Sequence, residues 1–340
     1  MDSMLLVDSL YVNYGGALVL LRYLVESLRA KNVRFFLLVD ARCENEFKNL
    51  SNVEYRTASM SARRDFYVAH RNEFSSVLCF GNVPPPIKLK SRVYTYVHNI
   101  NLLKIPAMSP LKRRFQSFLK QRVIDFYGRN TDCWIVQTEN TRNELKRHLF
   151  QGRKEVLVLP FYRIDEDLRK AKDSQEERTD YALIGELSYP RGHGIILDVW
   201  RELHKRGIDR TLHLTVSNNT EKQKEYCQRV KLLQEEGVRI ENHGFIPFPE
   251  VIEIYKKTKA IVYPSLNESL GLSVIEAIEA GCDVLTADLP YVHTICNPTK
   301  TFDCRSVNSI CEAVFYYEAG QGLRSELKIK NRVDELIALL

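Results

Sequence analysis

The feature that most constrains the fold is a repeated alternation of short apolar runs with segments of helical periodicity. In the first half, strand-length apolar runs lie at 4–9, 33–40, 77–80, 93–97, 133–137 and 155–159. Helical segments lie between them at 16–31, 110–129 and 139–149. Such alternation is typical of parallel sheets that are covered by helices on both faces. The sequence therefore predicts an α/β protein with doubly wound, Rossmann-like sheets.

The second half repeats the scheme. Apolar runs lie at 180–185, 211–216, 238–241, 260–263 and 283–286, and helical segments at 193–206, 221–236, 248–257, 271–280, 306–319 and 324–340. A chain of 340 residues is longer than one core usually organises. We expect domains at 1–160 and 180–322, a charge-dense linker at 161–179, and a C-terminal helix within 323–340 that can pack back on the first domain. Two such domains present their ligand-binding loops across a cleft.

Composition excludes several other classes of protein. Hydrophobic residues make up 44% of the chain and charged residues 27%, which disordered and collagen-like chains do not reach together. No apolar run approaches the ~18–20 residues that a bilayer span requires. The start Met1-Asp2-Ser3 lacks the basic segment of a secretory signal, so we expect a cytoplasmic protein.

Cysteine and histidine spacing argues against a metal site. The eight cysteines include no C-x-x-C pair and mostly lie in apolar runs, which favours reduced, inert thiols. No two Cys or His pairs have the spacing that closes a tetrahedral zinc site. Asp165-Glu166-Asp167 has a D-x-D pattern, but it lies in the charge-dense segment and is interpreted as solvated. We therefore expect neither a metal nor any other cofactor.

Charge is divided unevenly along the chain. Residues 1–160 contain 25 Lys and Arg against 14 Asp and Glu, whereas residues 161–340 contain 24 against 29. Part of the excess is a basic, apolar segment at 111–123, with cations at Lys112, Arg113, Arg114, Lys120 and Arg122. Such a helix can lie on an anionic lipid surface, or its apolar stripe can face the core. No recognised nucleic-acid reading motif accompanies it, so no nucleic-acid partner is expected.

Two carboxylates follow the apolar run at 260–263. Pro264 ends the run and helical periodicity begins near Gly271, which puts Glu268 at a helix N-terminus and Glu276 inside the helix. Amides at a helix start can hold an anionic group, and carboxylates accept hydrogen bonds from ligand hydroxyls. The alternative is that Glu268 only favours the helix start and Glu276 lies on a solvated face.

A glycine-rich loop follows the apolar run at 180–185. Gly185, Gly192 and Gly194 surround Arg191 just before a helical segment. Backbone N–H groups in such a turn can approach a phosphate closely, and Arg191 can neutralise it. A plain tight turn is the alternative.

Taken in this order, the motifs resemble those of the retaining glycosyltransferases of family 4, which have the GT-B fold. The resemblance covers residues 181–290. Its motifs are Gly-x5-[Lys/Arg]-Gly at 185–192, Gly-Phe-Ile at 244–246, Pro-Ser-x-x-Glu at 264–268 and Glu-x7-Glu at 268–276. Fainter matches are Tyr-Gly-Gly-Ala at 14–17, Tyr-Val-His-Asn at 96–99 and Ile-Val-Gln-Thr at 135–138.

The resemblance implies a role for each matching residue. Arg191 would bind the donor diphosphate, Glu276 the ribose and Glu268 the transferred sugar. His98, which follows an apolar run, would contact the donor sugar as a further catalytic residue, with a purely structural histidine as the alternative. The other implied donor-binding positions are Gly15, Gly16, Gly185, Phe245, Ile246, Ser269, Leu270 and Gly271.

One position departs from the family pattern. The family usually has arginine directly after the strand glycine, and this chain has Glu186. A carboxylate there would repel a diphosphate unless it points away or another cation, such as His193 or one near Arg163, takes over.

The resemblance implies a retaining glycosyltransferase that uses a nucleotide-diphosphate sugar. The basic first half suits a lipid-linked or polysaccharide acceptor, with a role in bacterial envelope polysaccharide synthesis and peripheral contact with the inner membrane face. Two alternatives stay open: a nucleotide-sugar-binding subunit with decayed catalysis, which Glu186 motivates, and a nucleotide-sugar 2-epimerase.

Overall fold

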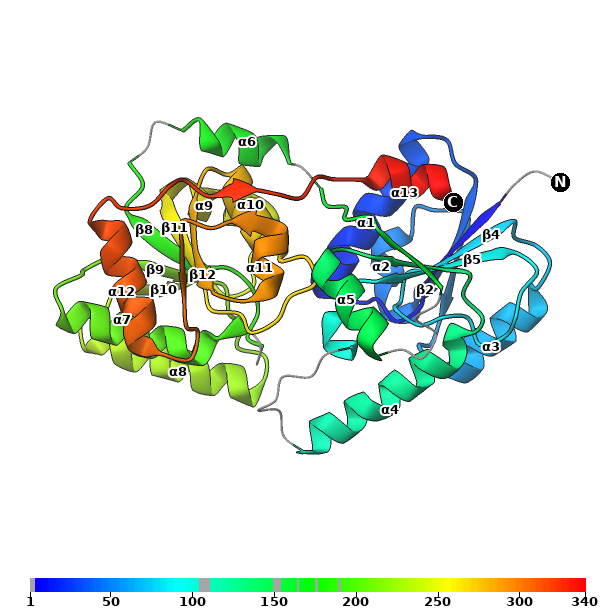
Figure 1. Ribbon diagram of the computed structural model, residues 1–340, viewed down its shortest axis with the longest axis horizontal. Coiled ribbons are helices and arrows are strands. Elements are labelled where there is room, and N and C mark those ends of the chain that lie inside the picture. The colour runs from blue at the N-terminus through cyan, green and yellow to red at the C-terminus, as the bar shows by residue number, and fades with distance from the viewer. Residues whose placement is uncertain (1–3, 104–110, 149–153, 164, 175–176, 189–190) are drawn as a thin grey trace. The chain divides into compact units, whose positions relative to one another are not determined.

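The computed structural model describes residues 4–103, 111–148, 154–163, 165–174, 177–188 and 191–340. The chain divides into two compact units, and the polypeptide crosses between them twice. Unit 1 comprises Met1–Arg163 and Lys330–Leu340, and unit 2 comprises Ile164–Ile329. Each unit contains a parallel sheet flanked by helices (Figure 1), which confirms the predicted α/β class.

Unit 1 is built on a seven-stranded sheet with the order β3-β2-β1-β4-β5-β6-β7. Its strands are β1 (Leu5–Ser9), β2 (Phe35–Asp40), β3 (Val53–Arg56), β4 (Ser76–Cys79), β5 (Arg92–Val97), β6 (Cys133–Val136) and β7 (Glu155–Val158). Its helices are α1 (Gly15–Ala30), α2 (Glu44–Phe47), α3 (Met60–Ala69), α4 (Leu111–Gly128), α5 (Glu139–His148) and α13 (Val333–Leu339). The strand order reverses between β1 and β4, which is where doubly wound sheets bind ligands.

Three elements of unit 1, the short helix α2, strand β3 and helix α3, have no counterpart among the predicted elements. Strand β3 is half-buried at every position, so its sequence lacks a continuous apolar run. Helix α3 buries Arg63, whose Nε lies 2.7 Å from Asp8 Oδ2, and Tyr67 donates to the same carboxylate at 2.7 Å. A charged residue that is buried by pairing breaks the apolar periodicity that would have revealed the helix.

The C-terminal segment belongs to unit 1 from Lys330 onward. Helix α13 contacts α1, and the hydroxyl of Tyr94 donates to the Leu339 carbonyl at 2.8 Å. The helix expected from residue 324 begins only at Val333. Residues 326–327 form strand β15 (Glu326–Leu327), which pairs antiparallel with β13 (Cys296–Asn297), because the preceding residues are held extended by contacts described below.

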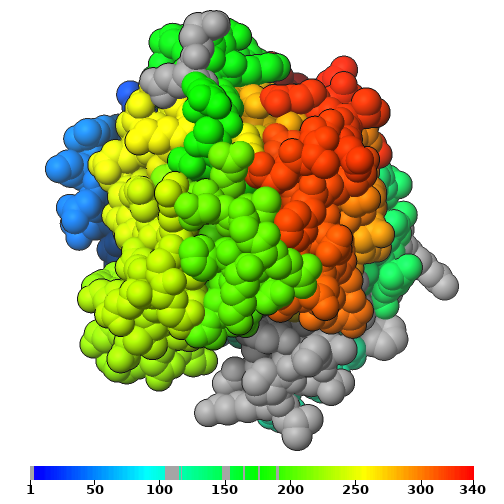
Figure 2. Space-filling view, turned by 90° about the vertical axis from the view of Figure 1, so that its left-hand side faces the viewer, coloured from blue at the N-terminus to red at the C-terminus, as the bar shows by residue number. Residues whose placement is uncertain are grey.

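Unit 2 is built on a six-stranded parallel sheet with the order β10-β9-β8-β11-β12-β14. Its strands are β8 (Asp180–Leu183), β9 (Leu212–Leu214), β10 (Ile240–Asn242), β11 (Thr258–Tyr263), β12 (Asp283–Ala287) and β14 (Lys300–Phe302). Its helices are α6 (Glu166–Lys172), α7 (His193–Lys205), α8 (Glu221–Glu235), α9 (Phe248–Lys257), α10 (Leu272–Glu279), α11 (Pro290–Ile295) and α12 (Val307–Glu318). Helix α7 packs between α8 and α12, and the three helices lie side by side in Figure 2.

The segment expected to be a linker is part of unit 2 instead. Residues 166–172 form α6, which packs against α9 and α10 and buries Leu168 and Ala171. Asp165 is its N-cap, with its side chain accepting from the Asp167 amide at 2.9 Å. Acidic residues in the first turn and basic ones in the last suit the helix dipole, so the charges that suggested a linker stabilise a helix.

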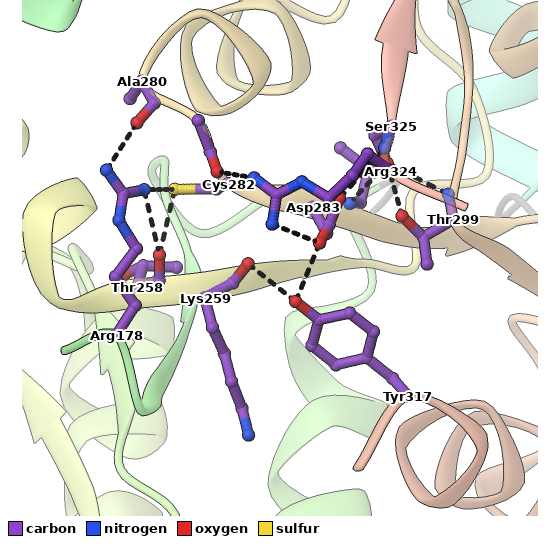
Figure 3. Close-up of polar contacts among 12 residues, drawn as sticks. Arg178, Thr258, Lys259, Ala280, Cys282, Asp283, Thr299, Tyr317, Arg324 and Ser325 are labelled. Carbon is purple, nitrogen blue, oxygen red and sulfur yellow. Dashed lines mark hydrogen bonds and ion pairs between the residues drawn. The ribbon is translucent and has the colours of Figure 1, made fainter. Parts of the chain in front are cut away.

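At the amino ends of the unit 2 strands, a polar network joins distant segments (Figure 3). We call Arg178, Asp283, Tyr317, Arg324 and Ser325 the amino-edge network. Asp283 accepts hydrogen bonds from the Tyr317 hydroxyl at 2.9 Å, Arg324 Nη1 at 3.0 Å and the Ser325 amide at 2.9 Å. These bonds hold residues 324 and 325 against β12 in an extended path.

Arg178 completes the amino-edge network. Its guanidinium donates to the carbonyls of Ala171 and Ala280 at 2.5 and 2.8 Å, which lie at the C-terminal ends of α6 and α10 (Figure 3 shows the second). One half-buried cation thereby caps carbonyls at the ends of two helices.

Candidate functional site

The glycine-rich loop of unit 2 brings Arg191 back over the end of β8. Gly185 has a φ of +131°, and a Cβ at this position would lie 2.0 Å from Arg191 Nη1. His193 stabilises this turn, since its Nε2 donates to the Gly185 carbonyl at 3.1 Å. The positive φ therefore favours glycine here, and a side chain at this position would displace the Arg191 guanidinium.

Arg191 faces several acidic groups. Its Nε lies 3.7 Å from Glu268 Oε1, and the two side chains are 29% and 18% exposed. Burial lowers the pKa of Arg191, but Tyr263, Glu268 and Glu276 outweigh this effect and raise that pKa above its ordinary value. Arg191 is therefore a permanent cation at the carboxyl ends of the strands.

Glu268 is held in place by two hydroxyls. Its Oε1 accepts from the Tyr263 hydroxyl at 2.7 Å and from Ser265 Oγ at 3.1 Å. Burial, with Glu268 next in importance, raises the pKa of Tyr263 well above its ordinary value, so this tyrosine stays a donor. The Tyr263 contact ties Glu268 to the end of β11, a partner that spacing in the sequence did not reveal.

Glu276 lies in α10 and has a weaker set of partners. Its Oε2 accepts from the Tyr255 hydroxyl at 3.4 Å, a long bond. Burial raises the pKa of Glu276 to about 7, while Tyr255 and Arg191 act in the opposite direction. The carboxylate thus has capacity to accept hydrogen bonds that the chain itself uses little, unlike a solvated helix face.

Helix α10 begins beside these carboxylates. Gly271 is its N-cap with a φ of +66°, and Ser269 and Leu270 just before it are buried. Ser273 in the first turn donates to the Ile184 carbonyl at 3.1 Å, which links the start of α10 to the end of β8. The positive end of α10 therefore lies near the Arg191 loop.

A hollow of about 380 Å³ lies beyond the ends of β9 and β10. Ser217, Cys227 and Phe245 are among the residues that line it. Phe245 is 81% exposed, and the adjacent Gly244 adopts a φ of +70°. An exposed backbone turn beside a hollow can present its amides and carbonyls to a planar ligand, as predicted for Phe245 and Ile246.

Glu186 points toward the start of α8. Its carboxylate accepts hydrogen bonds from the Ser217 hydroxyl and from Gln223 Nε2, the latter at 2.9 Å. The predicted substitute cation His193 is unsuitable, because burial lowers its pKa to about 4 and leaves it neutral at pH 7. The chain's own donors therefore satisfy Glu186, and Arg191 remains the cation at this loop.

In unit 1, His98 follows β5 and is oriented by its neighbours. Its Nε2 lies 2.9 Å from the Phe80 carbonyl, an acceptor, and 3.0 Å from Asn82 Nδ2, a donor, and these two contacts fix the direction of the ring. Asn82, at a φ of +66°, accepts from the backbone amides of His98 and Asn99 at 2.8 and 3.0 Å. Burial lowers the pKa of His98 to about 4, which makes the ring neutral. Asn82 was not among the predicted site residues.

Gly15 and Gly16 begin α1, as the glycine loop predicted. Gly15 has a φ of +64°, and both residues are exposed. They lie in unit 1, close in sequence to the end of β1, whereas the other predicted donor-binding residues lie in unit 2.

The basic segment forms α4, and much of its apolar surface is exposed. Phe115, Phe118 and Phe126 are 63%, 50% and 55% exposed, while Ile124 is buried in the unit 1 core. The Arg122 guanidinium lies 5.3 Å from the centre of the Phe118 ring. The side chains of Lys112, Arg113 and Arg114 lie outside the described residues. Among the helices that the structure describes, none is both long and apolar enough to span a bilayer.

Comparisons with known proteins agree with this geometry. The family model of group 1 glycosyl transferases matches residues 164–333, half of the chain. Over 50 residues the chain is 36% identical to the O-antigen chain mannosyltransferase RfbU of Salmonella typhimurium, a match that spans 15% of this chain and 14% of that protein.

Solved structures with a similar fold cover both units. Sucrose-phosphate synthase from Thermosynechococcus elongatus has a TM-score of 0.73 at 15% identity, over 94% of this chain and 90% of that one. HepE of Anabaena in complex with UDP and glucose has a TM-score of 0.70 at 15% identity, over the same shares. The lipopolysaccharide outer core galactosyltransferase WaaB has a TM-score of 0.63 at 10% identity, over 99% and 94%.

The two parallel sheets and these neighbours confirm the predicted GT-B fold. Unit 2, with its glycine loop, Arg191 and paired carboxylates, is the region that the family model matches. The chain therefore belongs to the group 1 glycosyltransferases.

Proposed function

We propose that the protein transfers a sugar from a nucleotide-diphosphate sugar to an acceptor hydroxyl with retention of the anomeric configuration. The observation that carries this proposal is the convergence of Arg191, Glu268 and Glu276 near the N-terminal end of α10. A cation and helix amides suit a diphosphate, whereas carboxylates suit the hydroxyls of ribose and sugar. The related fold of HepE, described in complex with UDP and with UDP-glucose, supports a donor of this chemical class.

Each residue has a defined task in this reaction. The bond from the sugar C1 to the diphosphate oxygen breaks, and a bond from C1 to the acceptor oxygen forms on the same face. The acceptor proton passes to the departing phosphate. Arg191 and the amides around Ser269, Leu270 and Gly271 stabilise the charge on the diphosphate, and Glu268 positions the sugar. His98 contacts the donor sugar from unit 1, and no metal takes part.

Donor binding is the first test. Calorimetry with UDP, GDP, ADP and UDP-glucose should identify a nucleotide that binds the wild-type protein. Glu276→Ala should weaken that binding by roughly 10–150-fold, because a charge-assisted bond to ribose is worth ~1.5–3 kcal/mol. Glu279→Ala is the matched control on the same helix, since Glu279 instead faces Arg169 at 3.8 Å. Equal affinity of a folded Glu276→Ala protein would remove the ribose role.

Product analysis separates the enzyme classes. Transfer with retention gives a glycoside with the anomeric configuration of the donor, which NMR reads directly. Donor binding without transfer to any acceptor would indicate a binding subunit, and release of an epimerised nucleotide sugar without acceptor would indicate a 2-epimerase. The contacts of Glu186 with Ser217 and Gln223 weaken the case for decayed catalysis.

For the acceptor, we propose a lipid-linked or polysaccharide substrate of envelope polysaccharide synthesis. A cavity of about 500 Å³ in unit 1 is lined by Tyr11, Asn82 and Asn99, with Leu119 and Lys120 contributed by α4. Its amides and cation suit a polar, anionic group, and its position beside α4 suits an apolar chain.

The proposal places the protein in the cytoplasm, in peripheral contact with the inner membrane face. Helix α4 exposes Phe115, Phe118 and Phe126 together with Lys120 and Arg122. Exposed aromatic residues beside cations favour the interface of an anionic bilayer, where each cation contributes ~1 kcal/mol.

Vesicle flotation tests this contact. The variant Lys112→Gln, Arg113→Gln, Arg114→Gln, Lys120→Gln and Arg122→Gln should lose flotation on anionic vesicles, and rising salt should weaken wild-type flotation. The control removes five exposed unit 1 cations elsewhere: Arg22, Arg29, Lys31, Arg34 and Lys48. Equal flotation of the two variants, or no flotation of wild type at low salt, would leave a soluble acceptor as the better account.

A further inference from the structure

Two histidines and a glutamate meet at strands β9 and β10 of the unit 2 sheet. His213 lies in β9, Glu241 lies beside it in β10, and His243 follows two residues later. His213 Nδ1 lies 3.0 Å from His243 Nε2 and 3.4 Å from Glu241 Oε2, and His243 Nε2 lies 3.8 Å from the same oxygen. Parallel pairing of β9 with β10 creates this cluster from residues that are far apart in sequence.

These distances match the ligands of one metal ion. Zinc bonds of ~2.0–2.1 Å in a tetrahedron separate neighbouring ligand atoms by about 3.3 Å. The three donor atoms of the cluster lie at 3.0, 3.4 and 3.8 Å from one another. Among the residues that the structure describes, this is a group whose His and carboxylate atoms all lie within 4.8 Å.

The lone pairs that face one another in the cluster also favour a bound cation. His213 Nε2 lies 3.2 Å from Asp180 Oδ2, a contact that favours the tautomer of the neutral ring in which Nε2 carries the proton and Nδ1 has a lone pair. That lone pair faces both the Glu241 carboxylate and the His243 ring. A single proton on His243 Nε2 can satisfy one of the facing electron pairs, but not both.

Asp180 supplies the support that metal-binding histidines usually have. Its Oδ2 faces His213, and its Oδ1 accepts from Thr179 Oγ1 at 3.0 Å. The His213 side chain is 4% exposed, so its ring cannot turn freely. A carboxylate behind a buried histidine sets the tautomer and aims the other nitrogen at the ion.

We propose that His213, Glu241 and His243 bind one zinc ion or a similar late transition-metal ion, with Asp180 as the positioning residue. The two imidazoles favour such ions over magnesium and calcium, which prefer oxygen ligands. Glu241 is 59% exposed, so water can complete the coordination. Strand β10 is the edge strand of the sheet, so an ion can reach Glu241 from solvent. The chain that follows β10, near residue 250, also lies at the surface and is yellow in Figure 2.

A bound ion would affect the shape of the neighbouring hollow and would take no part in the transfer reaction. His243, Gly244 and Phe245 all line that hollow. An ion bound to His243 would tie the start of this turn to β9. This inference does not depend on the proposed donor, because metal binding is measured without any nucleotide.

Zinc binding is measured on untagged, metal-stripped protein with a non-thiol reductant present. Calorimetry should show one Zn²⁺ per chain. His243→Ala removes a ligand and should weaken binding at least ~100-fold, because three protein ligands hold the ion. Asp180→Asn should weaken it by ~10–100-fold while the three ligands remain. His204→Ala and Cys227→Ser are the controls for other unit 2 ligands and should leave the affinity unchanged.

Cobalt provides a second readout. Co²⁺ bound by the cluster should give the visible absorption of a tetrahedral site, which Glu241→Gln should alter. His243 and Glu241 are exposed, so circular dichroism of the metal-free variants should match that of wild type. Absence of stoichiometric zinc binding, or binding that survives both His243→Ala and Glu241→Gln, would overturn the proposal.

Discussion

The two edges of the unit 2 sheet use charged residues in opposite ways. At the amino edge, Asp283 accepts three hydrogen bonds and joins β12 to residues 317–325. At the carboxyl edge, Glu276 accepts one long bond from Tyr255, and its pKa is raised to about 7. A carboxylate whose capacity is used by the chain stabilises the fold, whereas one with unused capacity is available to a ligand.

The same contrast holds for the arginines. Arg178 donates to backbone carbonyls at helix ends. Only another hydrogen-bond donor could replace Arg178 there. Arg191 lies among acidic side chains, the nearest of which, Glu268, is 3.7 Å away. A diphosphate can approach the second arrangement without leaving a backbone group unpaired.

The largest expected effect is at the amino edge. Asp283→Asn should lower the free energy of unfolding by about 3 kcal/mol, because the buried side chain at this position would then be poorly matched to its three donors. The control is Asp288→Asn, whose exposed carboxylate pairs with His293 and should cost less than ~1 kcal/mol. Urea unfolding measures both. Equal stability of the two variants would show that the hydrogen bonds of Asp283 do not stabilise the fold.

Replacing Glu276 should raise the stability of the protein at neutral pH, whereas Asp283→Asn lowers it. The folded pKa of Glu276, about 7, exceeds its ordinary value of 4.5, so its contribution to stability is full at low pH and lost as pH rises through 7. Relative to Glu276→Gln, wild type should lose up to ~3 kcal/mol of unfolding free energy as the pH rises from about 4 to 8.

Trp200 reports on unit 2, so urea unfolding is read from its fluorescence in a Trp134→Phe background. A stability difference between wild type and Glu276→Gln that stays constant over this pH range would show that burial does not raise the pKa of Glu276. The stability gained by Glu276→Gln should come with weaker donor binding, since a neutral amide accepts less strongly from ribose.

Arg191→Ala should affect ligand binding more than stability. Affinity for a nucleoside diphosphate should fall by roughly 10–150-fold, whereas affinity for the nucleoside alone should stay unchanged, because the partner is the phosphate. Arg201→Ala, at an exposed pair with Glu236, is the control. Calorimetry with both ligands checks the result, and equal losses for nucleoside and diphosphate would indicate a merely structural role.

The smallest effect should come from Glu186. Glu186→Gln should change donor affinity by less than ~5-fold, because the carboxylate is directed to Ser217 and Gln223. The same calorimetric titration measures it. A gain well above that range would show that Glu186 repels the diphosphate after all.

Much of the fold and part of the candidate site could be predicted because local sequence carries them. A buried parallel strand is a short apolar run, so β1, β5, β11 and β12 were located from neighbouring residues alone. The glycine loop around Arg191 and the helix start at Gly271 are also local, because each depends on consecutive residues and on a positive φ.

Other features depend on contacts between distant residues, which only the tertiary structure decides. Helix α3 was hidden because its buried Arg63 pairs with Asp8, 55 residues away. The charged segment before β8 becomes α6 because α9 and α10 cover its apolar side.

The sequence by itself determined the α/β class, the order of the motifs and their place at strand ends, since these follow from periodicity over a few residues. The tertiary structure decided where Glu186 points, how Asn82 holds His98, and that His213 meets His243. Side-chain direction and the pairing of strands arise when the chain packs, so no spacing along the sequence encodes them directly.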